Sequence, residues 1–179
     1  SRGVLVRDLM ACPTVAAVVA ALDDGRAAAF RPFEIIALDP SGDRARLTWD
    51  GRALASARGA AVAPPVSSSG HDTAAVLAAR AAHYGRTVGA GVPVAAIADD
   101  GGDALARLEG YQRSHVPSRG AFSVCMHRPD ARTVSLTLVT VGPVRVAMRY
   151  GDGPACTAVL GAPLTLARRS APAASAAAG

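Results

Sequence analysis

The feature that most constrains the fold is a set of short strand-like segments joined by tight turns between residues 33 and 56. FEIIALD at 33–39 and ARLTW at 45–49 are rich in strand-forming residues, and the turn PSGD at 40–43 separates them. Asp50-Gly51 forms a second tight turn, and RALAS at 52–56 follows it. Because the connections are so short, each strand must pair with the one before it. The segment therefore predicts an antiparallel meander.

Helical patterns flank this meander. Residues 3–11, 13–23, 73–86 and 103–111 have apolar side chains at helical spacing, and Asp72 is a good N-cap for the third helix. A further strand is expected at 143–150, where Val144, Val146 and Met148 alternate with other side chains. Strand groups that alternate with helices predict an α+β fold with mainly antiparallel sheet, covered by helical layers.

The composition suits one domain followed by a tail. Half of the 179 residues are hydrophobic but only 4% are aromatic, so Val, Leu and Ala must build most of the core. We expect a single domain over 1–160. We expect a disordered tail over 161–179, since the Ala-, Ser- and Pro-rich end of the chain has too little apolar surface to order itself.

Charge and cysteine usage exclude several classes of protein. The 19 basic residues are all Arg, are scattered, and have no aromatic side chains between them, which argues against nucleic-acid binding. The longest apolar run, 14–22, is too short to span a membrane. Three cysteines at wide spacings argue against a disulfide framework and favour a reducing, cytoplasmic location.

The most unusual stretch is FSVCMHRPDARTVSLTLV at 122–139, which we expect to form a β-hairpin. Alternation along a strand would place Ser123, Cys125 and His127 on one face. If Ser135 and its neighbouring threonines on the second strand share that face, small polar groups, a thiol and an imidazole lie about 5 Å apart.

Three interpretations of this hairpin stay open. In the first, the polar side chains hydrogen-bond to one another as ordinary packing, and an Arg128–Asp130 ion pair fixes the turn. In the second, the polar face lines a pocket in which Cys125 or His127 contacts a small-molecule ligand. Finally, Cys125, Met126 or His127 could ligate haem, with Arg128 or Arg132 pairing with the propionates. No CxxC or HExxH motif occurs, so we assign no metal ligands.

Two further segments could form pocket walls. Ser68 and Ser69 belong to a serine run before the helix expected at 73–86, where free N–H groups attract anions. Ordinary helix capping explains this run equally well. His115 lies in the loop before the hairpin and could orient a ligand or bond to a loop carbonyl.

The block SHVPSRGAFSVCMHRPDARTVSLT at 114–137, followed by YGDGPAC at 150–156, resembles the C-terminal signature of the NRDE family of transport-and-Golgi-organisation-type proteins. SRGVLVRDLM at the start and the SSSGHD loop are similar to other parts of that family. The resemblance covers about residues 1–157 and implies that the chain is a C-terminal fragment.

The resemblance implies a fold like that of the N-terminal-nucleophile (Ntn) hydrolases: two stacked antiparallel sheets between helical layers. It implies a small-molecule amide hydrolase whose nucleophile lies upstream of Ser1, so no catalytic residue is assigned within this chain. The alternative is a non-enzymatic protein that binds or carries haem. Both alternatives stay open at the level of sequence.

Overall fold

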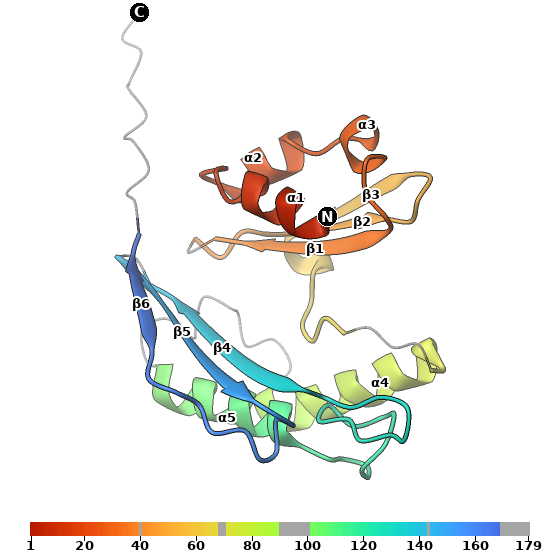
Figure 1. Cartoon of the computed structure of the whole chain (residues 1–179), viewed down its shortest axis with the longest axis vertical. Coiled ribbons are helices and arrows are strands. Elements are labelled where there is room, and N and C mark those ends of the chain that lie inside the picture. Colours follow the sequence, from red (N-terminus) through yellow and green to blue (C-terminus); the bar gives the residue numbers. More distant parts are fainter. Residues whose placement is uncertain (40, 68–70, 90–100, 143, 169–179) are drawn as a thin grey trace, which may run out of the picture. The chain divides into compact units, whose positions relative to one another are not determined.

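The computed structural model describes residues 1–39, 41–67, 71–89, 101–142 and 144–168 (Figure 1). The chain has an α+β fold with two three-stranded antiparallel sheets, as the sequence predicted for the fold class. It divides into two compact units, Ser1–Val62 and Ala63–Ala167.

The first unit begins with three short helices and continues into the predicted meander. The helices are α1 (Arg2–Leu9), α2 (Val15–Ala20) and α3 (Asp24–Ala27), and the strands are β1 (Phe33–Leu38), β2 (Arg44–Trp49) and β3 (Leu54–Arg58), followed by the short helix η1 (Gly59–Ala61). Each α-helix has a side-chain N-cap, from Ser1, Thr14 and Asp23 respectively. The helix expected at 13–23 is shorter in the structure, at Val15–Ala20, and α3 begins just after the expected range.

The meander forms because its alternation gives the sheet one apolar face. Phe33 pairs with Trp49 and Ile35 with Leu47, so these side chains share a face. That face packs with Leu5 and other apolar side chains of the helices, which lie over the sheet (Figure 1). The turn after β2 depends on Gly51, whose φ of 100° is strained for any residue with a Cβ.

The second unit consists of two helices and the second sheet, with α5 packed against the sheet. Its helices are α4 (Thr73–Tyr84) and α5 (Gly101–Arg113), and the wider turn η2 (Gly85–Gly89) extends α4. Asp72 caps α4 by accepting a hydrogen bond from the backbone of Ala75, as predicted. The sheet consists of β4 (Ser135–Val141), β5 (Arg145–Asp152) and β6 (Leu164–Ala167), in that order.

Two apolar clusters hold the second unit together. Leu136 and Leu138 of β4 point toward α5, where they pack with Leu105, Cys125 and small side chains of the 155–160 segment. A second cluster joins Tyr84, Val88 and Tyr111 between the helices. Burial raises the pKa of the Tyr111 hydroxyl to about 12, so this phenol stays neutral in the core.

The structure corrects the prediction of a hairpin over 122–139. Residues 122–125 form bends rather than a strand, and β4 pairs with β5 instead. What remains of the hairpin is a tight turn, in which Arg128 N donates to Ala131 O and His127 forms an isolated bridge with Arg132. The segment is irregular because its backbone bonds to residues outside it, as described below.

Strand β6 lies within the range 161–179 for which the sequence predicted a tail, and residues 169–179 lie outside the described residues. Among the helices that the structure describes, none is both long enough and apolar enough to cross a membrane, which agrees with the sequence prediction.

Candidate metal centre

Three irregular segments of the second unit meet at one place. The first follows the end of α5 and carries His115, and the second carries Cys125 and His127. Cys125 N donates to Ser114 O at 3.0 Å, which joins these two segments. Thr133 N donates to Met126 O at 2.9 Å, which holds the second segment against the start of β4. These bonds replace the regular strand ladder predicted from the sequence.

Ser123 shapes the second segment. Its side chain is fully buried, and its Oγ lies 3.0 Å from Gly120 O and 2.8 Å from Cys125 O. Its own carbonyl accepts a hydrogen bond from Arg80 of α4. The Ser123 hydroxyl therefore stabilises the irregular backbone next to Cys125, because it bonds to backbone carbonyls.

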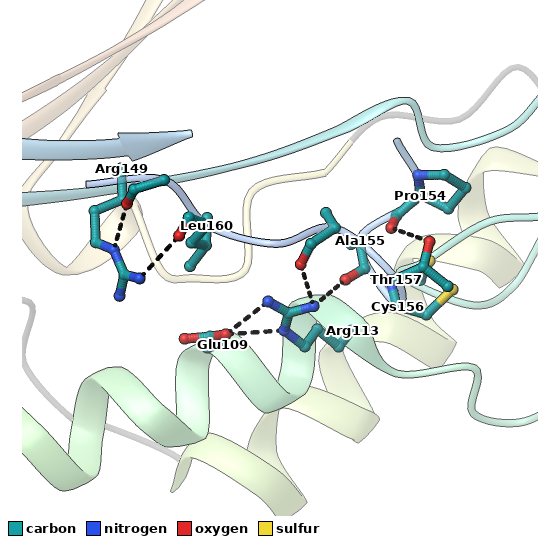
Figure 2. Close-up of polar contacts among 11 residues, drawn as sticks. Glu109, Arg113, Arg149, Pro154, Ala155, Cys156, Thr157 and Leu160 are labelled. Carbon is teal, nitrogen blue, oxygen red and sulfur yellow. Dashed lines mark hydrogen bonds and ion pairs between the residues drawn. The ribbon is translucent and has the colours of Figure 1, made fainter. Parts of the chain in front are cut away.

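The third segment is a short turn after β5 that carries Cys156. Thr157 N and Ala158 N both donate to Pro154 O at 2.9 Å, which closes the turn. Figure 2 shows Arg113 of α5 reaching to this turn, where Nη1 donates to Ala155 O at 2.5 Å and Ala158 O at 2.9 Å. Glu109, one helical turn earlier, accepts from the same guanidinium at 2.9 Å. Arg113 thus links the Cys156 turn to a rigid helix.

The three segments bring two imidazoles and two thiols together. The cluster, which we call the His2Cys2 cluster, consists of His115, Cys125, His127 and Cys156, and its four ligand atoms all lie within 4.8 Å of one another. His127 Nε2 is central: it lies 3.2 Å from His115 Nε2 and 3.5 Å from each of the two sulfur atoms. The Cys156 backbone N–H also points to Cys125 Sγ, at 3.4 Å.

The three distances measured from His127 Nε2 match edges of a zinc coordination tetrahedron. With Zn–N near 2.05 Å and Zn–S near 2.3 Å, tetrahedral angles place nitrogen about 3.3 Å from nitrogen and about 3.6 Å from sulfur. The corresponding distances at His127 Nε2 are 3.2 Å and 3.5 Å.

Hydrogen bonding alone accounts for this arrangement poorly. A ring nitrogen carries either one lone pair or one N–H, so His127 Nε2 cannot make a full hydrogen bond to all three neighbours at once. A cation between the four atoms would instead accept a lone pair from each of them.

Burial shifts the pKa values of two members of the cluster, Cys125 and His115. Cys125 is fully buried, and this burial raises the pKa of its thiol. Burial is the largest cause that lowers the pKa of His115, and the charges of Arg119 and His127 lower it further. The neutral imidazole is the form that binds a metal, whereas the thiols must lose their protons to do so.

The structure brings some of the predicted site residues together and separates others. Cys125, His127 and His115 converge, with Cys125 and His127 on the same side of their segment as the sequence predicted. Arg128 pairs with Asp130 at 2.5 Å, which confirms the predicted ion pair at the turn. Ser135 begins β4 opposite Asp152 and is no part of the cluster. Ser68 and Ser69 lie outside the described residues.

Cys156 is the member that sequence reasoning missed. It lies 29 residues after His127 along the chain, so no short ligand motif includes it. The signal that could have found it is the turn sequence GDGPAC directly after a strand, because a turn there can carry a thiol toward residues distant in sequence.

Comparison with known proteins leaves the geometry as the only guide to function. No protein-family model, no curated protein and no solved structure matches this chain. The resemblance to the NRDE family accordingly remains a prediction from the sequence.

Proposed function

We propose that this protein is a metal-binding protein whose His2Cys2 cluster binds one zinc ion. The observation that carries the proposal is the position of His127 Nε2, which lies at tetrahedral edge distances from three other ligand atoms. Two thiolates and two neutral imidazoles are a ligand set that zinc prefers, whereas calcium and magnesium prefer oxygen ligands.

The proposed role of the ion is structural. Four protein ligands complete a tetrahedral shell, which leaves no position for a water molecule or a substrate. The ligands come from three segments that lack regular secondary structure and carry few backbone bonds to each other. A bound ion would therefore cross-link the end of α5, the 120–134 segment and the turn after β5, and its binding energy would add to the stability of the second unit.

Zinc titration of the reduced full chain against a chromophoric chelator tests this proposal. We expect one zinc ion per chain. The variants Cys156→Ala and His115→Ala should bind zinc far more weakly, while the matched variants Cys12→Ala and His71→Ala, which change residues outside the cluster, should bind like the parent. Absence of stoichiometric binding, or equal loss in the two pairs, would overturn the proposal.

On the sequence resemblance alone we also propose that the chain contributes to a stacked-sheet, Ntn-hydrolase-like domain of an NRDE-type protein with small-molecule amide hydrolase activity. The two antiparallel sheets and the helices are compatible with it. Its nucleophile would lie upstream of Ser1, and the zinc ion would have no part in that reaction. Amide turnover by a longer chain that carries an N-terminal cysteine, lost on replacing that cysteine, is the expected result.

The haem alternative draws less support from the geometry. A porphyrin occupies four positions in one plane around its iron, so at most two protein atoms can bind, from opposite sides. The His2Cys2 cluster instead gathers four ligand atoms around one point. Arg128, considered as a partner for propionate, pairs with Asp130. We expect added haem to show no Soret shift that depends on His127.

A further inference from the structure

We infer that Cys125 and Cys156 are a peroxide-sensitive pair, which hydrogen peroxide oxidises to a disulfide with release of the zinc ion. This inference rests on the proposed zinc site and concerns its regulation. The two cysteines lie 31 residues apart in the chain, yet both sulfur atoms belong to the cluster whose ligand atoms lie within 4.8 Å. Bond formation would bring them to about 2.05 Å, a small movement for side chains in irregular segments.

The two thiols differ in access, which sets the order of the steps. Cys125 is fully buried, whereas Cys156 is half-buried and is followed by the exposed residue Thr157. Peroxide therefore reaches Cys156 first. The Cys156 thiolate attacks one peroxide oxygen, the O–O bond breaks, and one proton converts the departing hydroxide to water, which leaves Cys156 as a sulfenic acid.

The Cys125 thiolate then attacks the Cys156 sulfur. The S–S bond forms, the S–O bond breaks, and a second proton converts the hydroxide to water. Across both steps two thiolates lose two electrons, and one peroxide with two protons becomes two water molecules. Solvent water supplies both protons, because His127 Nε2, which lies 3.5 Å from each sulfur, is itself a proposed zinc ligand.

Disulfide formation removes two of the four zinc ligands. Two imidazoles hold zinc much more weakly than the complete set, so the ion should leave. A dithiol reductant reverses the reaction and restores the site. The third cysteine, Cys12, packs with the apolar core of the first unit and provides an internal control.

The experiment uses the reduced full chain loaded with one equivalent of zinc. Zinc binding is measured first, by chelator competition. Hydrogen peroxide is then added, released zinc is followed with a colorimetric chelator, and free thiols are alkylated before tryptic digestion and mass spectrometry. Cleavage after arginine places the two cysteines on separate peptides, 120–132 and 150–168.

We expect one zinc ion released per chain, a disulfide between those two peptides, and recovery of zinc binding after a dithiol and fresh zinc are added. Cys12→Ala should behave like the parent. Failure to bind zinc before peroxide is added would overturn the proposed function and this inference with it. Zinc that stays bound under peroxide, or leaves while the cysteines become sulfinic acids without a disulfide, would overturn this inference alone.

Discussion

Replacing Arg113 with methionine tests whether Arg113 holds Cys156 in place for zinc binding or only stabilises the second unit. Arg113 donates to the carbonyls of Ala155 and Ala158, both in nearly fully buried residues, while methionine keeps the apolar stem and suits a helix. A buried carbonyl that loses its donor costs about 1–3 kcal/mol. The Arg113 side chain is 28% exposed, so water can partly replace its hydrogen bonds, and we take about 1 kcal/mol for each carbonyl.

The total of about 2 kcal/mol corresponds to a roughly 30-fold loss of zinc affinity if the substitution destabilises only the zinc-bound form of the protein. Arg149→Met is the matched control. Arg149 of β5 also donates to two carbonyls of the same connection, those of Gly161 at 3.1 Å and Leu160 at 3.2 Å (Figure 2). These two carbonyls lie beyond the Cys156 turn, and Arg149 is exposed.

Chelator competition measures zinc affinity and urea unfolding measures stability for both variants. We expect Arg113→Met to weaken zinc binding between about threefold and 30-fold, and Arg149→Met to change it by no more than about twofold. Equal changes in the two variants, or an Arg113→Met protein that is less stable but binds zinc like the parent, would refute the positioning role.

Two further predictions concern protons and backbone packing. Zinc affinity should rise with pH, because burial raises the pKa of Cys125 and protons compete with zinc for the thiolates. Below the thiol pKa values, the affinity should rise by about 100-fold per pH unit, since two thiols lose their protons. A competition titration that gives a flat profile between pH 6 and 8 would contradict this prediction. Gly151→Ala should destabilise the second unit by about 1–3 kcal/mol and weaken zinc binding, because its Cβ would lie 2.9 Å from Val159 O. Gly110→Ala is the control, because its Cβ would meet nothing within 4 Å; it should leave zinc affinity unchanged and stabilise α5 by about 0.5–1 kcal/mol. If the two variants gave the same unfolding curves, the close approach of Gly151 to Val159 would be unimportant for stability.

The parts of the fold that sequence reasoning predicted are those with local causes. The meander β1–β3 follows from alternation and from turns that need residues such as Gly51, and the start of α4 follows from the Asp72 cap. Each of these signals lies within a few residues of the structure that it determines.

The missed parts have distant causes. Residues 122–127 alternate like a strand, but Cys125 bonds to Ser114 and Arg80 bonds to Ser123, so tertiary hydrogen bonds override the local pattern. Strand β6 is four residues long and forms because β5 offers it an edge. The same reason explains why the sequence predicted only three of the four members of the His2Cys2 cluster, His115, Cys125 and His127. The turn that carries Cys156 is held by a hydrogen bond from Arg113 of a helix distant in sequence.

X-ray absorption spectroscopy at the zinc edge tests the central claim most directly. For the reduced full chain loaded with one equivalent of zinc, we expect a first shell of two sulfur atoms at about 2.3 Å and two nitrogen atoms at about 2.0–2.1 Å. A shell made only of nitrogen and oxygen atoms, or a sulfur contribution that persists unchanged in Cys156→Ala, would contradict the His2Cys2 site.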